Sequence, residues 1–425
     1  MRASALGSSL VTEKGIKWRL AAVFFLVAAM PGCWVPVIAN VLDAKGWADL
    51  TDWVLVIPAM GAIISPLFLG ALADQRINAE KLLGGVLFLN AASTAIAFLF
   101  VIKGNSPAWF LFFLIVKALV SAPSWSLLMV VVLANIKEPE REFGGIRVWG
   151  TVGWMAAGCF VSLFSLDESP YTGVFAAVFG LLAASLCLIL PSTPPLGQKS
   201  KSLLDALGFR AFSIFKNRDT SVYFLTAFLF SVPLAAYYPY TAKFLKSLGV
   251  ERVAAFLSLG QVTELVALLA MGWTFRKLRV KWLFLIALGA GTLRYCGYMG
   301  TAWGDGILSR PGQLLLIGLG ILMHGICWSL FFETGKIFVN RRVEGPLRGQ
   351  AQSLLTVLTG GVATILGIFL SGFLYRWCVL GSGPGWGGFW LILTGFCGLG
   401  MIVFAFGYQG QAVGNEGPKS ASEEA

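Results

Sequence analysis

The sequence predicts an all-α membrane protein with twelve transmembrane helices in two halves of six, and three observations predict it. The 425 residues are 57% hydrophobic and only 12% charged, whereas a soluble globular chain carries roughly 25% charged residues. The apolar runs are continuous over about 20 residues, the length of a helix that crosses a bilayer, and lack the alternating polarity of barrel strands. A longer polar segment separates two sets of six such runs.

The expected spans follow the apolar runs in chain order. In the first half they are residues 18–41, 51–73, 82–102, 107–134, 144–166 and 171–191, and in the second half 221–243, 253–275, 281–302, 312–338, 352–376 and 386–408. We expect residues 1–191 to form the first half, 192–220 a cytoplasmic linker with an amphipathic surface helix, 221–409 the second half, and 410–425 a disordered tail.

The charge of the loops predicts the orientation. With the N-terminus inside, the even-numbered loops, the linker and both tails hold about 21 of the 32 Lys and Arg residues, and the odd-numbered loops about 7. Both termini are therefore expected in the cytoplasm, with the chain in the cell membrane. The net charge of +11 belongs to these loops. It does not indicate a nucleic-acid site, because no basic stripe with interleaved aromatic residues lies in a soluble segment.

Few residues have the chemistry of an enzyme or of a metal site. The seven cysteines occur singly, without a C-x-x-C motif, and the chain has one histidine. There is neither a G-x-x-x-x-G-K-[ST] nucleotide loop nor an H-E-x-x-H zinc motif. We expect no cofactor, no metal and no enzymatic activity. Two six-helix halves joined by a cytoplasmic linker are instead typical of a transporter with its site between the halves at mid-membrane.

The loop between the second and third expected spans carries a gate motif. Gly70, Asp74 and Arg76 fit the pattern G-x-x-x-D-x-R, which resembles the loop signature of the major facilitator superfamily. Glycine lets two helices approach closely, and Asp74 can interact with a helix N-terminus or a basic partner at the inner gate. The equivalent loop of the second half, residues 272–281, keeps its glycine and four basic residues but has no acid.

Three spans carry polar and aromatic residues at helical spacing. In the fifth span, Arg147, Thr151 and Trp154 share one helix face and could hold a polar, ring-bearing solute. The alternative is that Arg147 extends to the cytoplasmic interface while the other two pack. In the eighth span, Gln261 and Glu264 share a face near mid-membrane. Burial penalises the charged form of a carboxyl, so Glu264 can load and release a proton, unless it forms a static ion pair with Arg294 or Lys117.

The tenth span holds the single histidine. His324 and Trp328 are four residues apart and share a face, whereas Glu333, nine residues from His324, is expected to point elsewhere and to pair with Lys336. Two interpretations of His324 remain open. It is either a core histidine bonded to a neighbouring backbone group, or a residue that contacts the substrate or the proton.

Several segments together resemble the nucleoside:proton symporters, a branch of the major facilitator superfamily. Residues 146–153 resemble their fifth-span signature, 207–217 their central-loop helix, 258–264 their eighth span, and 349–352 the start of their eleventh span. The resemblance implies that Arg147 and Thr151 contact the sugar or base, that Gln261 and Glu264 bind nucleoside, and that Glu264 helps to couple protons. It also places Trp154 and Trp328 at positions where the family has aromatic residues.

The chain departs from this family at four pocket positions. Ser329 stands where an aspartate is expected, His324 where a tyrosine is expected, and Ala235 and Tyr238 where polar amide side chains would line the pocket. The proton route is then expected to run through Glu264 alone or with His324. We expect a monomeric carrier that takes up a nucleoside-like solute with protons by alternating access. The alternatives are a carrier of another small polar solute such as a sugar, a membrane-embedded enzyme and a channel.

Overall fold

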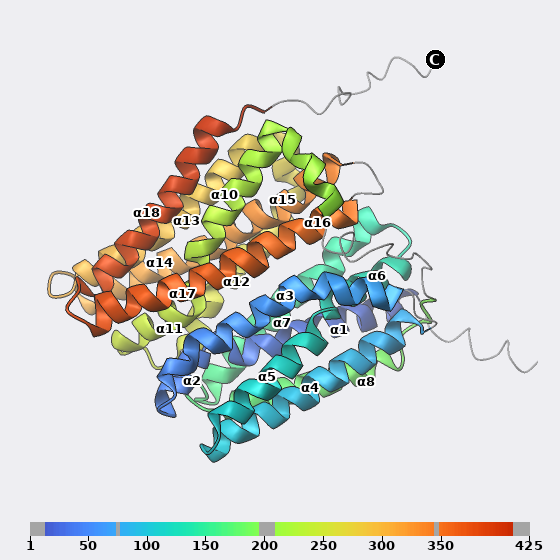
Figure 1. Cartoon of the computed structure of the whole chain (residues 1–425), viewed down its shortest axis with the longest axis horizontal. Helices are drawn as coiled ribbons and strands as arrows, with labels where there is room; N and C mark the ends of the chain where they lie inside the picture. Colours follow the sequence, from blue (N-terminus) through green and yellow to red (C-terminus); the bar gives the residue numbers. More distant parts are fainter. Residues whose placement is uncertain (1–12, 74–76, 195–208, 344–347, 411–425) are drawn as a thin grey trace, which may run out of the picture.

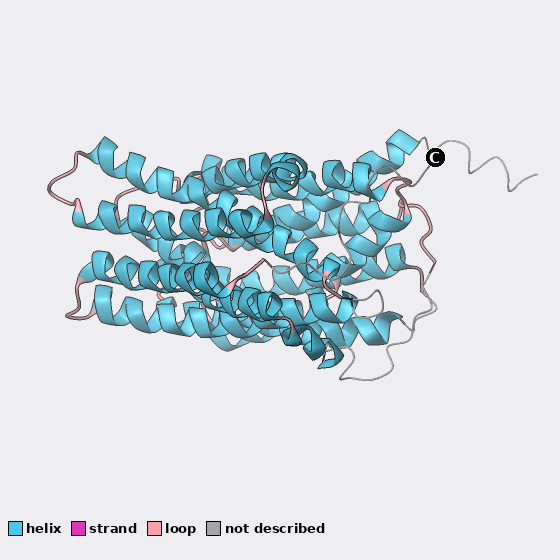
Figure 2. Ribbon diagram, turned by 90° about the horizontal axis from the view of Figure 1, so that it is seen from above, coloured by secondary structure: helices cyan, strands magenta, loops and turns pink. Residues whose placement is uncertain are grey.

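A computed structural model shows an all-helical bundle (Figure 1). It describes residues 13–73, 77–194, 209–343 and 348–410. In the part of the chain that the structure describes, every regular element is a helix, and the long helices run roughly along one axis (Figure 2). Nine helical segments within these residues are long and apolar enough to cross a membrane. The full count of twelve spans stays a prediction.

The first half contains nine elements. They are α1 (Glu13–Trp34), α2 (Ile38–Ala44), the 3₁₀ turn η1 (Ala48–Leu50), α3 (Thr51–Ala73), α4 (Ala79–Lys103), α5 (Pro107–Ser121), α6 (Ser124–Ala134), α7 (Pro139–Leu163) and α8 (Tyr171–Cys187). Each expected span of this half corresponds to one or two of these helices, with ends that differ by a few residues.

The second half begins with a 3₁₀ segment and contains three π-helical segments. Its elements are η2 (Phe209–Lys216), α10 (Arg218–Leu234), α11 (Tyr237–Ser247), α12 (Val253–Lys277), α13 (Val280–Trp303), α14 (Arg310–Trp328), η3 (Ser329–Glu333), α15 (Thr334–Arg341), α16 (Arg348–Thr356), η5 (Val357–Ala363), α17 (Thr364–Tyr375), η6 (Arg376–Leu380) and α18 (Gly385–Gly407). The π-helical segments η3 and η5 interrupt the tenth and eleventh expected spans, and η6 begins at the last residue of the eleventh.

Three spans that the sequence predicts as single helices are broken beside proline. The first divides into α1 and α2 around Pro36, the fourth into α5 and α6 at Pro123, and the seventh into α10 and α11 just after Pro233. Proline has no backbone N–H and its ring clashes with the preceding turn, so it interrupts the ladder of helical hydrogen bonds. Hydropathy alone does not detect such breaks, because the residues on both sides are equally apolar.

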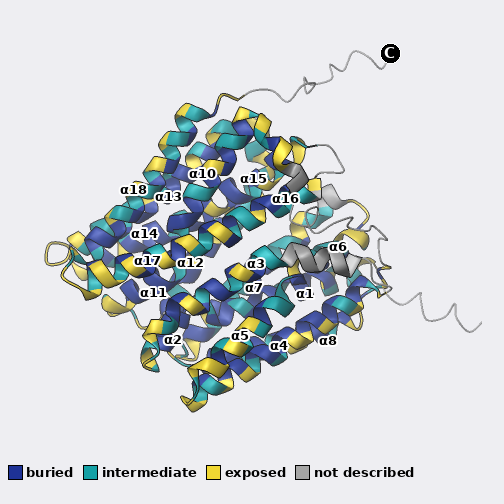
Figure 3. Ribbon diagram, in the orientation of Figure 1, coloured by how far each residue is buried: buried dark blue, intermediate teal, exposed yellow. Residues whose placement is uncertain are grey.

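Each half has its own hydrophobic core. One cluster of buried residues occupies the second half, and two clusters lie almost wholly in the first. The halves meet through α7 against α12, α3 against α17 and η5, and α2 against α11. Exposed residues occur along much of the outer helix faces (Figure 3), and many of them are large and apolar, as suits a surface that faces lipid.

The linker segment that the structure describes packs on the second half. In η2, Ile214 is buried in the core of that half and Phe215 packs against it. The last residues of the expected amphipathic helix form the 3₁₀ segment η2, while residues 195–208 and the tail from 411 lie outside the described residues, so the helix stays a prediction. Within the described residues, an apolar side of this segment faces the core of the second half.

Candidate functional site

A large cavity lies between the two halves. Its volume is about 650 Å³, within the range of pockets that hold small organic solutes. Nine described elements contribute to its wall, namely α1, α6, α7, α11, α12, α14, η3, α15 and α16. The residues that line it are Ala28, Trp125, Ser126, Met129, Phe143, Arg147, Gly150, Thr151, Trp154, Tyr238, Gln261, Glu264, His324, Trp328, Glu333, Lys336 and Gln352.

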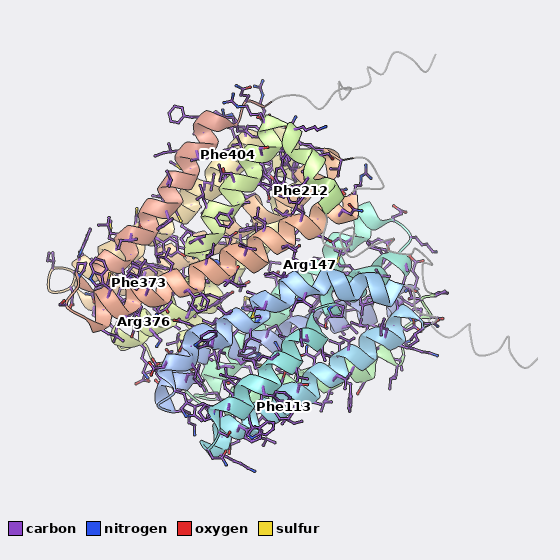
Figure 4. The ribbon with its side chains drawn as sticks, viewed as in Figure 1. Phe113, Arg147, Phe212, Phe373, Arg376 and Phe404 are labelled. Atoms are coloured by element: carbon purple, nitrogen blue, oxygen red, sulfur yellow. The ribbon has the colours of Figure 1, made fainter. Side chains whose placement is uncertain are left out.

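All seven residues that the sequence singled out for substrate binding line this cavity. They are Arg147, Thr151, Trp154, Gln261, Glu264, His324 and Trp328. The first three come from α7 in the first half, and the other four from α12 and α14 in the second. Arg147 lies between the halves in Figure 4, and its guanidinium carbon is 5.8 Å from the centre of the Trp125 ring. Arg147 therefore faces the cavity.

A hydrogen bond joins the halves at the middle of the cavity. Thr151 Oγ1 in α7 donates to Glu264 Oε1 in α12 over 3.0 Å, and the bond is buried. The ion pairs considered for Glu264 do not form: Arg294 bonds to His324 instead, and Lys117 lies over the Trp34 ring at 5.0 Å. The Glu264 carboxyl thus lies on the wall of the cavity, at the contact between the two halves.

Aromatic rings line the cavity beside this hydrogen bond. Trp154 of α7 and Tyr238 of α11 are 5.6 Å apart, centre to centre, across the interface between the halves. Gln261 Nε2 donates to the Tyr238 hydroxyl over 3.4 Å. Tyr238 thus occupies the place expected for an amide side chain and still offers a polar group to the cavity. Flat aromatic faces next to hydrogen-bonding groups suit a solute that carries a ring.

The expectation that Glu333 points away from His324 is wrong. Both residues line the cavity, because Ser329–Glu333 form the π-helical segment η3. A π-helix has more residues per turn than an α-helix, so it rotates the following side chains about the axis. The expected pair is present, with Lys336 Nζ donating to Glu333 Oε1 over 2.8 Å.

Of the remaining predicted pocket positions that the structure describes, Ser329 and Ala235 do not line the cavity. Gly70 lies in α3, while Asp74 and Arg76 of the gate motif lie outside the described residues. Ser329 is fully buried, with its hydroxyl 3.4 Å from the Glu264 backbone oxygen. Ala235 lies in the turn between α10 and α11. Within the described residues, no group of three potential metal ligands occurs.

The bundle has two distinct ends. At one, here called the near end, α1 begins next to the start of α7, as the 3.1 Å ion pair of Lys17 with Glu142 shows. The cavity extends toward this end, since Phe143, Lys336 and Gln352 are among its lining residues. The opposite end, here called the far end, contains the loops that follow α2, α7 and α11. Among the described residues, several polar contacts join the halves at the far end.

Three ion pairs close the far end. Lys243 Nζ is 2.7 Å from Asp43 Oδ1, and Arg376 Nη1 is 2.8 Å from Asp52 Oδ2. Lys246 binds Glu168 over 2.9 Å. In each pair one residue comes from each half. The far end is therefore held shut by contacts between the halves while the cavity extends toward the near end.

Asp167 strengthens the same closure. Its Oδ1 accepts hydrogen bonds from Ala254 N over 2.7 Å and from Ser162 Oγ over 2.9 Å. Ser162 Oγ also accepts from Ala255 N, so two side chains of the first half cap the first turn of α12 in the second half. Burial raises the pKa of the Asp167 carboxyl, and the hydrogen bonds from Ala254 and Ser162 only partly offset this. The carboxyl therefore holds a proton more readily than it would in water.

Comparison with known proteins gives a consistent result. A family model described as "Nucleoside H+ symporter" matches residues 14–412. The xanthosine permease of Escherichia coli (strain K12) is 29% identical over 372 residues, 82% of this chain and 85% of that protein. The nucleoside permease NupG of the same organism is 24% identical over 414 residues, 92% of this chain and 95% of that protein.

Solved structures show the same fold. The crystal structure of the nucleoside transporter NupG matches with a TM-score of 0.77 at 21% identity, over 93% of this chain and 99% of that one. A D-xylose–proton symporter matches with a TM-score of 0.69 at 15% identity, over 93% and 99%. The fold is that of a major facilitator transporter.

Proposed function

Because the chain belongs to the nucleoside H+ symporter family, we propose that it imports nucleosides together with protons across the cell membrane, as a monomer with both termini in the cytoplasm. The observation that carries this proposal is the buried hydrogen bond of Thr151 with Glu264, which places one ionisable carboxyl in the wall of a cavity between two halves. A carboxyl there contacts both the solute space and the opposite half, so its protonation can be linked to movement of the halves.

The cavity supplies groups for both parts of a nucleoside. Trp154, Trp328 and Tyr238 offer aromatic faces on which a base can stack. Arg147 and Gln261 offer hydrogen-bond donors to ribose hydroxyls and to acceptor atoms of the base. The Thr151 hydroxyl donates its proton to Glu264, so it offers the solute an acceptor. The chain needs no cofactor for this activity, since binding and movement of the halves are the only steps.

The structure corresponds to the inward-facing state in this proposal. Loop charge assigns the near end to the cytoplasm, and the cavity extends toward it. The ion pairs of the far end then form the closed outer gate. Transport requires these contacts to break and the near end to close, which is the alternating access of two-half carriers.

Accumulation should depend on protons. In membrane vesicles that contain the carrier, a radiolabelled nucleoside should accumulate when the outside is more acidic or the inside negative. A protonophore should reduce the internal concentration to the external one, because no nucleotide-binding motif supplies another energy source. The measurement is filtration uptake with uridine and adenosine. Accumulation driven by a sodium gradient after the proton gradient has collapsed would contradict proton coupling. Uptake of xylose in place of nucleosides would instead favour a sugar carrier.

Cysteine labelling should test the orientation, because the two ends of the bundle should be accessible from opposite sides of the membrane. In a variant without native cysteines, Glu168→Cys at the far end should react with a membrane-impermeant thiol reagent added to intact cells. Lys137→Cys at the near end should react only after the cells are opened. Both side chains are well exposed, at 50% and 77%, so access is decided by the membrane. The reverse pattern would place the termini outside.

A further inference from the structure

A fully buried cation lies directly behind the cavity wall. Arg294 in α13 is 0% exposed, and among the described residues no carboxylate oxygen lies within 4.0 Å of it. The guanidinium carbon is instead 4.3 Å from the Tyr237 ring centre and 4.6 Å from that of Tyr295. Its Nη2 donates to the Tyr295 hydroxyl over 2.7 Å. Aromatic faces thus hold a positive charge that has no anion beside it.

The same guanidinium contacts the histidine of the cavity. Arg294 Nη1 is 2.9 Å from His324 Nδ1. A guanidinium only donates hydrogen bonds and does not lose its proton in proteins, so Nδ1 must be the acceptor and carries no hydrogen. In the neutral ring the proton is then on Nε2. The His324 ring also stacks on Tyr237, with ring centres 4.2 Å apart and an interplanar angle of 19°, which fixes its orientation.

We propose that Arg294 is a positioning residue that makes His324 a neutral, donor-only group for recognition of an acceptor atom on the nucleobase. Since Nδ1 is occupied by Arg294, only Nε2–H is available to a solute in the cavity that His324 lines. The positive charge behind the ring polarises it and strengthens that donor. This inference rests on the proposed function, because it takes the solute to be a nucleoside.

The surroundings of His324 favour the base over the sugar as its partner. Trp328 and Tyr238 both line the cavity, and their ring centres are each 6.1 Å from that of His324. A planar base that stacks between aromatic faces brings its edge to the donor of a neighbouring ring. A base with no acceptor at that edge would leave the Nε2–H without a partner, which disfavours its binding.

His324 is also unsuited to carry the coupled proton. A proton on Nδ1 would face the Arg294 donor and bring two positive charges together in a buried site. Of the two residues considered for proton coupling, Glu264 and His324, the geometry leaves Glu264. Arg294 thus separates solute recognition from proton transfer within one cavity.

The tautomer can be measured directly, because the chain has a single histidine. In purified protein with ¹⁵N-labelled histidine, the wild type at about pH 7 should show one protonated and one unprotonated ring nitrogen, the protonated one being Nε2. Arg294→Met, which removes the donor and keeps an apolar stem, should give both tautomers. Arg294→Lys keeps a cationic donor and should favour the wild-type tautomer.

A proton on Nδ1 in the wild type, or on both nitrogens, would overturn the proposal. The wild-type spectrum decides this point even if the Arg294 variants do not fold. It needs no solute, so it stands independently of whether the chain transports nucleosides.

Recognition is tested with adenosine, whose base accepts hydrogen bonds only at ring nitrogens. The probes are adenosine and its 1-deaza, 3-deaza and 7-deaza analogues, each of which lacks one acceptor, with affinity measured by competition against labelled nucleoside. The wild type should bind one analogue about tenfold more weakly than adenosine. His324→Phe keeps a flat ring without nitrogens. This variant should bind the weakened analogue as tightly as it binds adenosine. The affinities of the other two analogues relative to adenosine should be the same as in the wild type.

Two results would overturn this recognition. In one, the wild type binds all four compounds equally. In the other, His324→Phe weakens all four by the same factor, as a purely structural residue would. If no nucleoside binds at all, the proposed function fails and recognition of a base fails with it, while the tautomer measurement still reports what Arg294 does.

Discussion

A Glu264→Gln variant is expected to lose accumulation of nucleoside against a gradient while it keeps substrate binding and exchange. Glutamine has the shape of the acid and retains an oxygen that can accept from Thr151, which donates to Glu264 over 3.0 Å. It cannot gain or lose a proton, so movement of the halves no longer carries one. A proton crossing a potential of about 100 mV contributes about 2.3 kcal/mol, which corresponds to a concentration ratio of about 50. In the variant, the ratio of internal to external nucleoside should fall from about 50 to about 1, its value at equilibrium without proton coupling.

The measurement is uptake and counterflow in vesicles at several pH values, with protein quantity checked by immunoblot. Glu333→Gln is the matched control, because Glu333 lines the same cavity and is bonded to Lys336 over 2.8 Å. It should reduce accumulation far less. A well-expressed Glu264→Gln variant that still concentrates nucleoside when a proton gradient is applied would exclude the coupling role. If affinity falls while proton dependence persists, Glu264 binds substrate only.

Gly325→Ala is expected to destabilise the protein. Gly325 in α14 packs against the backbone of α12, where a Cβ would lie 2.5 Å from the Gly260 oxygen and would overlap the Glu264 backbone nitrogen. Backbone atoms of a packed helix cannot move aside as a flexible side chain can. Overpacking of this kind costs about 1–3 kcal/mol, and here the whole of α14 must shift. The thermal midpoint in detergent should fall by about 1–3 °C.

Gly395→Ala in α18 provides the control for Gly325→Ala. A Cβ at Gly395 meets nothing within 4 Å, so the exchange should leave the midpoint nearly unchanged or raise it slightly, because alanine favours helix more than glycine does. Both variants are compared by size-exclusion chromatography and thermal unfolding monitored by tryptophan fluorescence. Equal midpoints for the two variants would mean that the contact of α14 with α12 tolerates a methyl group, and that the close approach does not limit stability.

Much of the fold could be predicted from local properties of the sequence. A helix satisfies its own backbone hydrogen bonds, so a run of about 20 apolar residues in a membrane has almost no alternative. The predicted span 253–275 accordingly corresponds to α12, and 386–408 to α18, within two residues at each end. The shared faces in α7, α12 and α14 could also be predicted, since residues three or four apart lie on one side of a helix.

Other features depend on which helices meet, and hydropathy contains no information on this. The hydrogen bond of Thr151 with Glu264 joins residues 113 positions apart, and that of Arg294 with His324 joins residues 30 apart on different helices. For Arg294, residue type suggested an ion pair with Glu264, but the rotation of α13 turns it toward His324, Tyr237 and Tyr295. Only packed neighbours determine that rotation.

The sequence by itself determined that the chain crosses the membrane as helices, that it forms two halves, and that Arg147, Thr151, Gln261 and Glu264 are candidates for one site. These properties follow from side-chain polarity and helical periodicity, which act within a segment. The tertiary structure decided that Glu264 contacts the opposite half, that η3 turns Glu333 into the cavity, and that Arg294 fixes His324. Those outcomes depend on close contacts such as Gly325 against α12, where the shapes of two distant segments must fit together.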